Sequence, residues 1–286
     1  MADGLHIPTR PDRLTRDDLV VVIPALNESL RIREVVAGAL GECPRVIVID
    51  DGSDDGTAER VADLPVTVLR HEVRLGKGAS LRDGFAAALA MGARAIVTMD
   101  GDGQHLARDI PRLLAAANRH PGHVVIGARL HRRSQQPLHR RLANEFADWG
   151  IAWGTGYGVA DSQSGQRLYP AAVAALAEVP GEDFVFEAQI LISAAQQLGT
   201  RCVSVPIESR YQTVHGDEQF RPSHFKPLRD FSRITSHIVA GVFRRGGIPA
   251  VFRSIRANPA LIDDDERLGV LEPGRDPISA LDDAAR

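Results

Sequence analysis

The chain has 286 residues, of which 44% are hydrophobic, enough to bury the core of one large α/β domain with extensions. Its formal net charge of -3 argues against a general nucleic-acid-binding protein. The polar N-terminus has no signal-peptide core, and no apolar stretch approaches the roughly 18 residues of a membrane-spanning helix. Cys43 and Cys202 have no metal-binding spacing and are expected to be buried free thiols in a reducing compartment. We therefore expect a cytoplasmic protein without transmembrane helices.

Apolar segments of strand length alternate with helical stretches, a pattern typical of a parallel sheet covered on both faces. Strands are predicted at 19–23, 45–49, 66–69, 95–99, 124–127, 202–205 and 207–211. Helices are predicted at 28–40, 79–91, 109–118, 138–153, 171–178, 184–198 and 228–243. We expect residues 1–17 to form a polar leader, 18–243 the main domain with a C-terminal amphipathic helix, and 244–286 an extension with a mobile acidic tail.

Polar turns follow three of these strands at their carboxyl ends, where open α/β sheets bind ligands. They are residues 24–28, residues 50–57 and Asp100-Gly101-Asp102. Helix capping explains one such turn, whereas three in the same sheet are harder to explain by capping alone. The carboxylates of Asp100 and Asp102 repel each other unless a cation joins them, and their oxygens suit Mg²⁺ or Mn²⁺. Such an ion usually completes its shell with phosphate oxygens and water, which indicates a diphosphate substrate.

Four motifs in this order resemble those of inverting family 2 glycosyltransferases of the GT-A fold. They are Pro24-Ala25-Leu26-Asn27-Glu28, Asp50-Asp51-Gly52-Ser53-Asp54, Gly76-Lys77-Gly78 and Met99-Asp100-Gly101-Asp102-Gly103-Gln104-His105. Residues 161–169 add a likeness to the polyprenol-phosphate (dolichyl-phosphate) mannose and glucose synthases, with Gln166 where an aromatic residue is usual. The resemblance covers roughly residues 18–243. It implies a Rossmann-like, mostly parallel twisted sheet with helices on both faces.

The resemblance also implies a reaction: metal-dependent transfer of a hexose from a GDP- or UDP-hexose to a polyprenyl phosphate. It makes Asp102 the principal metal ligand and catalytic residue, with Asp100 assisting and Gln104 in support. Around the nucleotide it places Pro24, Ala25, Glu28, Asp51, Lys77, Asp100 and Gly101. A lysine between two glycines at a helix start can approach a phosphate closely, and carboxylates accept hydrogen bonds from base N–H groups and ribose hydroxyls.

On the acceptor side, a basic segment follows the strand at 124–127, and arginines can hold a phosphate bidentately. Its candidate phosphate ligands are Arg129, Arg132, Arg133, Arg140 and Arg141. A phosphate acceptor is already ionised and needs no strong base. A hydroxyl acceptor on a glycolipid or polysaccharide precursor would need one, for which Asp161 and Glu187 are the candidates. Glu187 is equally compatible with a helix residue paired with an arginine.

Apolar stripes at 142–153 and 231–243, both near arginines, either lie in a membrane interface or pack on the domain. If the stripes lie in a membrane interface, the enzyme is a peripheral protein on the inner face of the membrane. Two other classes stay open. A sugar-1-phosphate nucleotidyltransferase would carry a Gly-rich, Arg-containing loop at the position of residues 24–28, and a non-catalytic nucleotide-sugar sensor would not need both Asp100 and Asp102.

Overall fold

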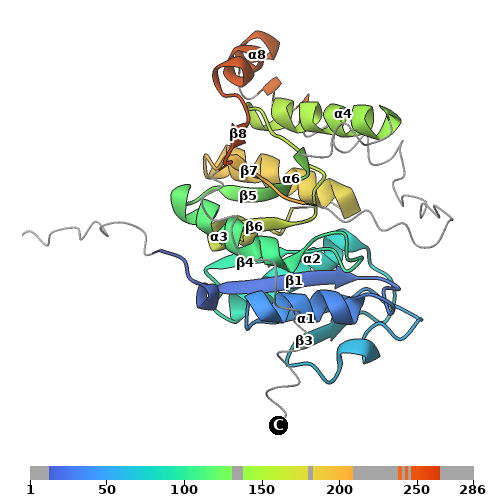
Figure 1. Cartoon of the computed structure of the whole chain (residues 1–286). Coiled ribbons are helices and arrows are strands. Elements are labelled where there is room, and N and C mark those ends of the chain that lie inside the picture. Colours follow the sequence, from blue (N-terminus) through green and yellow to red (C-terminus); the bar gives the residue numbers. More distant parts are fainter. Residues whose placement is uncertain are drawn as a thin grey trace, which may run out of the picture.

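A computed structural model describes residues 13–130, 138–179, 183–208, 238–239, 242–243 and 246–264. These residues form an eight-stranded sheet of order β3-β2-β1-β4-β6-β5-β7-β8 (Figure 1). The strands are β1 Leu19–Ala25, β2 Val46–Asp50, β3 Thr67–Arg70, β4 Ala95–Thr98, β5 Val124–Ala128, β6 Arg167–Pro170, β7 Cys202–Pro206 and β8 Leu261–Ile262. Only β6 runs antiparallel to its neighbours within this sheet, β4 and β5. The predicted mostly parallel α/β sheet is confirmed.

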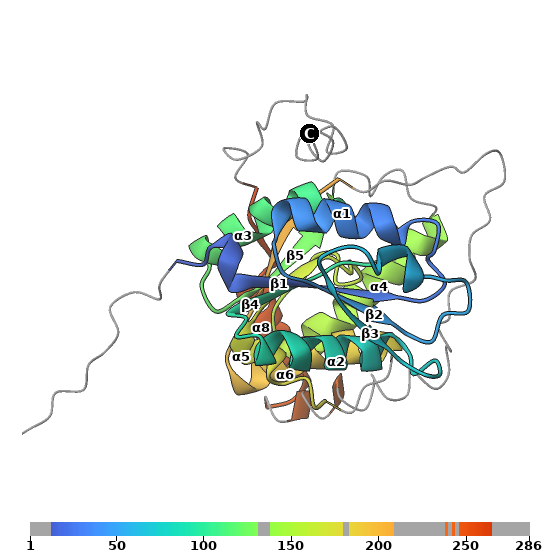
Figure 2. The same cartoon turned by 90° about the horizontal axis from the view of Figure 1, so that it is seen from below.

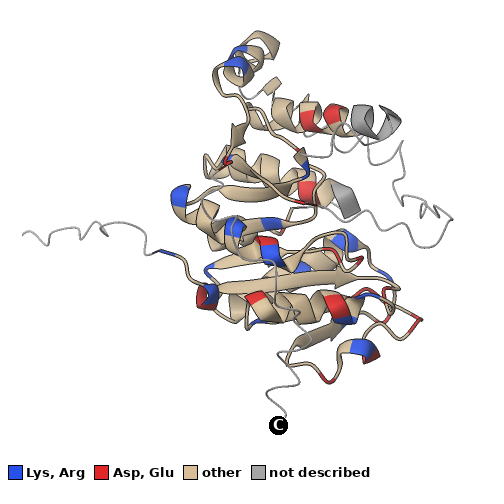
Figure 3. Ribbon diagram, viewed as in Figure 1, with Lys and Arg blue, Asp and Glu red and all other residues tan. Residues whose placement is uncertain are grey.

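The central strands are continuous apolar segments because both of their faces are covered. All residues of β2 and nearly all of β1 are buried. The register places Ala25 opposite Asp50 and Val22 opposite Thr98, so β1, β2 and β4 end at the same edge of the sheet. The three polar turns therefore lie side by side, and Figure 3 shows acidic residues in the loops at this edge.

Helices cover both faces of the sheet: α1 and α3 lie on one face, and α2, α5 and α6 on the other (Figure 2). Their bounds are α1 Ile32–Glu42, α2 Lys77–Ala90, α3 Ile110–Arg119, α4 Leu138–Thr155, α5 Ala171–Ala174, α6 Asp183–Gln197 and α8 Ile248–Ala257. Short 3-10 turns occupy Arg16–Asp18, Glu59–Val61 and Ala107–Asp109. Each face of the sheet has its own apolar core. None of the described helices has the length and apolar character needed to cross a bilayer.

Several predicted elements differ from the observed ones. The strand predicted at 207–211 is absent in its described residues, 207–208, because the neighbouring β5 ends at Ala128, opposite Pro206, and leaves no partner for a longer ladder. The helix predicted at 171–178 ends at Ala174. Of the helix predicted at 228–243, residues 238–239 and 242–243 are described and helical, and the remainder lies outside the described residues.

Three elements were missed by the sequence analysis: β6, α8 and β8. The expected extension thus contributes an edge strand, in which Leu261 pairs with Val203 of β7. Arg119 holds this edge from α3, since its Nε and Nη2 atoms donate to the carboxylate of Asp263 at 2.9 Å each. Most of the predicted acidic tail, residues 265–286, and residues 1–12 of the predicted leader lie outside the described residues.

Helix α2 approaches β1 closely at Gly84. A Cβ atom at this position would lie 2.4 Å from Cγ1 of Val22 and 3.4 Å from Cγ1 of Ile49. Both contacts are to branched side chains in a closely packed core, which has no room for an added methyl group. This packing sets the position of α2, whose first residue is Lys77.

Gly84→Ala should lower the free energy of unfolding by about 1–3 kcal/mol, because an extra methyl group forces strained packing in the core. The matched control is Gly41→Ala in α1, where an added Cβ meets nothing within 4 Å. That change should raise the free energy of unfolding by up to about 1 kcal/mol. Urea unfolding followed by circular dichroism measures both, and equal stability of Gly84→Ala and the unsubstituted protein would contradict the close approach.

Candidate active site

The turns after β1 and β2 are locked together by reciprocal hydrogen bonds. The backbone N–H of Asn27 donates to Ser53 Oγ at 2.9 Å, and the N–H of Asp54 donates to Asn27 Oδ1 at 3.1 Å. The N–H of Glu28 donates to Thr57 Oγ1 at 2.9 Å. Asn27 has a φ of 55°, a left-handed conformation that asparagine tolerates better than most residues. The two turns thus form one rigid surface beside the ends of the strands.

Gly101 lies against this surface, and a Cβ there would be 3.3 Å from both the Pro24 carbonyl oxygen and Ala25 Cβ. The fold therefore brings together Pro24, Ala25 and Gly101, three of the residues predicted to surround a nucleotide. Glu28 is in the same turn, with its carboxylate 3.9 Å from Arg31.

Asp51 is nearby but is already engaged by protein groups. Its Oδ1 accepts a hydrogen bond from the N–H of Leu75 and its Oδ2 one from the N–H of Gly76, each at 2.8 Å. His71 Nδ1 lies 2.8 Å from the same Oδ1. This carboxylate therefore fixes the loop that precedes α2, and its role toward a base or ribose stays a prediction.

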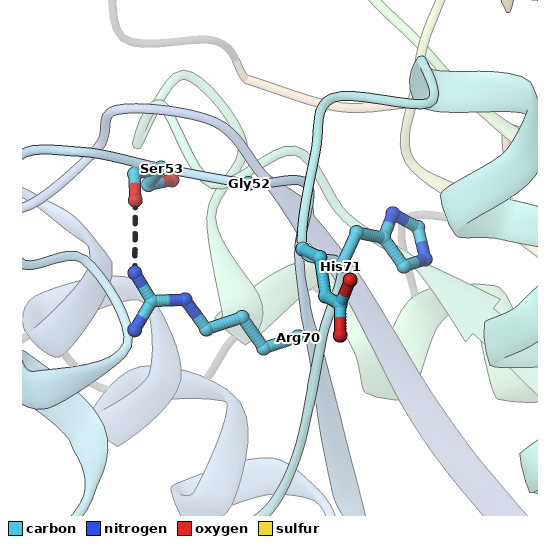
Figure 4. A pocket seen from close by; sticks show the side chains of 5 residues that line it. Gly52, Ser53, Arg70 and His71 are labelled. Carbon is cyan, nitrogen blue, oxygen red and sulfur yellow. Dashed lines mark hydrogen bonds between the residues drawn. The ribbon is translucent and has the colours of Figure 1, made fainter.

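A cavity of about 400 Å³ opens where β2 and β3 end (Figure 4). It is lined by Gly52, Ser53, Arg70, His71 and Glu72. Arg70 turns toward the β2 turn and donates to the Ser53 carbonyl oxygen at 3.0 Å. The volume is within the range of small-ligand sites. Arg70 ends β3, and His71 and Glu72 follow it; these three lining residues belong to no recognisable sequence motif.

Lys77 begins α2, directly after Gly76, whose φ of 97° suits glycine. Its ammonium lies 2.8 Å from Asp100 Oδ1 and 3.4 Å from Glu187 Oε2. Burial lowers the pKa of Lys77, but the negative charges of Asp100 and Glu187 outweigh this and raise the pKa above its usual value. Lys77 therefore carries a positive charge. It links Asp100, which is predicted for the nucleotide site, to Glu187, a candidate base on the acceptor side.

Asp100 lies over Gly165, and this contact requires a residue without a side chain. A Cβ at Gly165 would be 2.1 Å from Asp100 Oδ2. Thr98 holds the Gly165 loop in place, because its hydroxyl donates to the Gly165 carbonyl at 2.8 Å. Burial raises the pKa of Asp100, but the charge of Lys77 and the nearby His105, 3.6 Å away, bring this pKa well below its usual range. Asp100 is therefore ionised.

The pKa of Asp102 changes in the opposite direction: burial and the negative charge of Asp100 raise it. Its Oδ1 accepts a hydrogen bond from the backbone N–H of Gln104 at 3.0 Å, and the Gln104 side chain is exposed. Among the described residues, no three His, Cys, Asp or Glu side chains gather as a metal site. The donor set nevertheless fits Mg²⁺ or Mn²⁺, because two hard carboxylates that repel each other are joined by a divalent cation whose remaining ligands are phosphate and water.

Arg167 is a buried positioning group beneath this cluster. Its guanidinium donates to the carbonyl oxygens of Ser162 at 2.7 Å and Ser164 at 2.8 Å, and to Tyr169 Oη at 3.0 Å. It also lies 3.5 Å from Glu187 Oε1. A buried guanidinium is tolerated when carbonyl and carboxylate groups satisfy its donors. Arg167 thus orients both the Gly165 loop and Glu187; the motif at 161–169 contains it but did not reveal this role.

The acceptor-side residues are only partly described. Arg129 donates to Asp161 through its backbone N–H at 2.7 Å, its Nε at 2.8 Å and its Nη2 at 2.7 Å. Asp148 in turn accepts the N–H of Asp161, which has a φ of 52°. Of the other predicted phosphate ligands, Arg132 and Arg133 lie outside the described residues, and Arg140 and Arg141 belong to α4 with side chains that are not described. A joint phosphate site stays a prediction.

Comparison with known proteins defines the class of this protein. The Glycosyl transferase family 2 model matches residues 20–169. The chain belongs to this family and is a glycosyltransferase, which removes the nucleotidyltransferase and sensor alternatives.

Two relatives act on polyprenyl carriers according to their names. A polyprenol monophosphomannose synthase from Mycolicibacterium smegmatis is 29% identical over 202 residues, covering 66% of this chain and 76% of the relative. An undecaprenyl-phosphate mannosyltransferase from Micrococcus luteus is also 29% identical over 202 residues, covering 66% and 82%. Among solved structures, a glucosyl-3-phosphoglycerate synthase from Mycobacterium tuberculosis with Mn²⁺, UDP-glucose and phosphoglyceric acid matches with a TM-score of 0.55 at 22% identity, covering 80% of this chain and 85% of that chain. This likeness establishes the GT-A fold.

Gly165→Ala should reduce transferase activity about 10- to 100-fold, because the added methyl group displaces Asp100 from its position beside Lys77. Turnover of GDP-mannose and UDP-glucose, followed by release of nucleoside diphosphate, measures the effect. Gly41→Ala is the control for a neutral glycine replacement. Unfolding midpoints measured in parallel distinguish a local effect from misfolding, and unchanged turnover in a folded Gly165→Ala protein would contradict this role for the glycine.

Proposed function

We propose that this enzyme transfers a hexose from a nucleoside-diphosphate sugar to a polyprenyl phosphate, with inversion and with the help of Mg²⁺ or Mn²⁺. The observation that carries the proposal is the state of the two candidate bases. Asp161 accepts three hydrogen bonds from Arg129, and Glu187 lies between Lys77 and Arg167. A hydroxyl acceptor needs a base for its proton, whereas a phosphate acceptor arrives ionised. Engaged carboxylates therefore favour the phosphate.

The donor side is supported by three features that lie along one edge of the sheet. The cavity at Gly52, Ser53 and Arg70 suits the base, and the locked turns beside it suit the ribose. Lys77 carries its charge at the start of α2, where the N–H groups of a helix also favour a diphosphate. The wider nucleotide set is Pro24, Ala25, Glu28, Asp51, Lys77, Asp100 and Gly101.

Asp102, with Asp100 and Gln104, would hold the divalent cation. When bound, the ion supplies Lewis-acid stabilisation of the diphosphate leaving group. The protein's own residues set the geometry for this. Lys77 neutralises Asp100, and Gly165 leaves room for its carboxylate.

On the acceptor side, an oxygen of the lipid phosphate would form the new bond to the anomeric carbon. The bond from that carbon to the diphosphate would break, and its electron pair would leave with the diphosphate. Both reacting groups are anionic, so cations are needed between them. Lys77 and the arginines at 129, 132, 133, 140 and 141 are the proposed source of this charge.

A membrane surface is the proposed location of the reaction, on the inner face of the membrane. Helices α4 and α8 lie together at the end of the sheet that carries β7 and β8 (Figure 1), and the Ser254 hydroxyl of α8 donates to the Gly156 carbonyl at 2.8 Å. Exposed apolar side chains occur on both helices and on the described residues just before α8. They are Phe146, Trp149, Val239, Phe243, Ile248 and Phe252. We propose that they form one membrane-binding surface, the α4–α8 face.

The chemistry of the α4–α8 face fits an anionic bilayer. Phe146 and Trp149 are each 56% exposed and stack with ring centroids 5.7 Å apart. Helix α8 contains no acidic residue, and Arg256 lies over the ring of Phe252. A basic helix with exposed aromatic side chains can lie in the membrane interface.

Asp102→Asn should keep the fold and lose most of the sugar transfer to polyprenyl phosphate, because one anionic ligand of the cation is removed. The assay uses GDP- and UDP-hexoses with undecaprenyl phosphate and Mg²⁺ or Mn²⁺, and detects both glycolipid and nucleoside diphosphate. Asp63→Asn, which breaks the exposed pair with Arg33, is the charge-matched control and should behave like the unsubstituted enzyme.

Two results would count against this assignment. Equal turnover of Asp102→Asn at limiting metal would exclude Asp102 as the principal ligand. Efficient transfer to a soluble hydroxyl acceptor, with none to the lipid phosphate, would replace the proposal by the hydroxyl-acceptor reaction. Asp161 or Glu187 would then be the base.

The protein should bind anionic liposomes reversibly, and binding should weaken as salt increases. Each arginine near an anionic surface contributes about 1 kcal/mol and is screened over about 10 Å at 0.1 M salt. Co-sedimentation at low and high ionic strength measures this. Trp149→Ala and Phe252→Ala should reduce the bound fraction, whereas Met91→Ala, another exposed apolar residue, should not. Equal binding of all three variants would argue against the α4–α8 face.

A further inference from the structure

His71 joins two carboxylates beside the proposed nucleotide cavity. Its Nδ1 lies 2.8 Å from Oδ1 of Asp51, and its Nε2 lies 3.0 Å from Oδ2 of Asp83 in α2. The side chain of His71 is only 10% exposed, which limits its alternatives for hydrogen bonding. An imidazole can donate to two carboxylates at once only when both ring nitrogens carry protons. This arrangement therefore suits the imidazolium form.

The contact with Asp51 connects His71 to the phosphate-facing end of α2. Asp51 accepts the N–H groups of Leu75 and Gly76, the two residues that precede Lys77. Asp83 lies in the same helix, so His71 is tied to α2 at both contacts, once through the loop and once directly. The position of the Lys77 ammonium thus depends on this group of hydrogen bonds.

Neighbouring charged side chains have contacts or positions apart from the His71 ring. Arg70, the preceding residue, contacts Asp50 at 3.4 Å and Glu59 at 3.1 Å. Glu72, the following residue, lines the cavity and is exposed. Lys77 on α2 contacts Asp100 and Glu187. The carboxylates within hydrogen-bonding distance of the His71 ring in the described residues are those of Asp51 and Asp83.

We propose that His71 is a positioning residue: its protonated ring clamps the loop at 71–76 and α2 together, and thereby sets Lys77 for the donor diphosphate. Loss of the ring proton loosens the loop and weakens donor binding. The inference rests on the proposed function, because it assigns the loop to a nucleotide-sugar donor. It adds a residue that none of the motifs contains and predicts that donor affinity depends on pH.

The direction of this dependence follows from the pKa of His71. Burial lowers this pKa, but the hydrogen bonds to Asp51 and Asp83 outweigh burial and raise it above the usual histidine value. The clamp is therefore complete at pH values below the usual pKa of histidine. It is lost as pH rises through the raised pKa of the folded protein, because the neutral ring donates to one carboxylate and turns a lone pair toward the other.

Two variants test the clamp. His71→Asn retains an amide donor at this position but cannot become charged, and Asp83→Asn leaves the histidine with one carboxylate. The matched control is His120→Asn, since His120 lies 3.1 Å from Asp263 beside β8, the opposite edge strand from β3. The first measurement is amide hydrogen exchange of residues 71–77 without ligand, from pH 6 to 9 and corrected for intrinsic rates. The second is calorimetry with GDP and UDP in the presence of Mn²⁺ over the same range.

In the unsubstituted protein, protection of the Leu75 and Gly76 amides should fall about tenfold as pH rises, and the Kd of the bound nucleotide should rise by a similar factor, since one charge-assisted hydrogen bond is lost. In His71→Asn, protection of these amides and nucleotide affinity should both be low at every pH. Asp83→Asn should move both midpoints to lower pH, and His120→Asn should move neither.

The clamp would be overturned if the corrected exchange rates did not change with pH. It would also be overturned if they changed with pH to the same extent in His71→Asn, even if nucleotides bind. A pH-dependent clamp with unchanged nucleotide affinity would overturn its role in positioning Lys77. If neither nucleotide binds at any pH while exchange shows the clamp, the proposed function falls, and with it the positioning role.

Discussion

Two neighbouring carboxylates at the end of β4 impose a charge constraint on the whole site. Asp100 and Asp102 are both partly buried, and the negative charge of Asp100 disfavours ionisation of Asp102. The direct compensating contacts are made to Asp100, from Lys77 at 2.8 Å and from His105 at 3.6 Å. Asp102 has no comparable cationic contact among the described residues, and its pKa is raised. This asymmetry is what makes the turn suited to a divalent cation brought in with an anionic substrate.

Compensation of Asp100 depends on elements from distant parts of the chain. Lys77 comes from the start of α2, whose approach to β1 is possible because residue 84 is glycine. Gly165 comes from the loop before β6, held by Thr98 and by the buried Arg167. Arg167 also contacts Glu187 of α6, so one guanidinium links the Gly165 loop to this helix. The acidic and basic groups therefore form one connected network, in which moving one member changes the surroundings of the others.

The antiparallel strand β6 is the topological feature that makes this network possible. It enters between β4 and β5, with Arg167 opposite Thr98, so its first residue lies at the edge where the parallel strands end. A parallel strand in this position would present its last residue there instead. Because of the reversal, the loop at 161–166 reaches Asp100 through Gly165, while the neighbouring Gly101 lies against Pro24 and Ala25 at the end of β1.

The amino-acid sequence by itself was sufficient for the parallel core, the family and the carboxylate pair. Strands β1, β2 and β4 are unbroken apolar segments followed by polar turns, and that pattern is local. Residues 161–169 were recognisable as a motif, but β6 within them was not, because a four-residue strand is defined by its partners. Likewise, β8 has only two residues, Leu261 and Ile262, and forms a strand through pairing with β7.

Only the tertiary structure decided how the charges pair. Glu187 was compatible with a base or with a partner of an arginine, and the packing of α6 against α2 places it between Lys77 and Arg167. The contact of His71 with Asp51 and Asp83 has no sequence signal, since residues 20 and 12 positions apart meet only when β3 and α2 are in place. The type of a helix or strand, and which of its residues are buried, can be inferred from the periodicity of the sequence. Ion pairs between separate elements depend on distances of a few ångström, which the packed core determines.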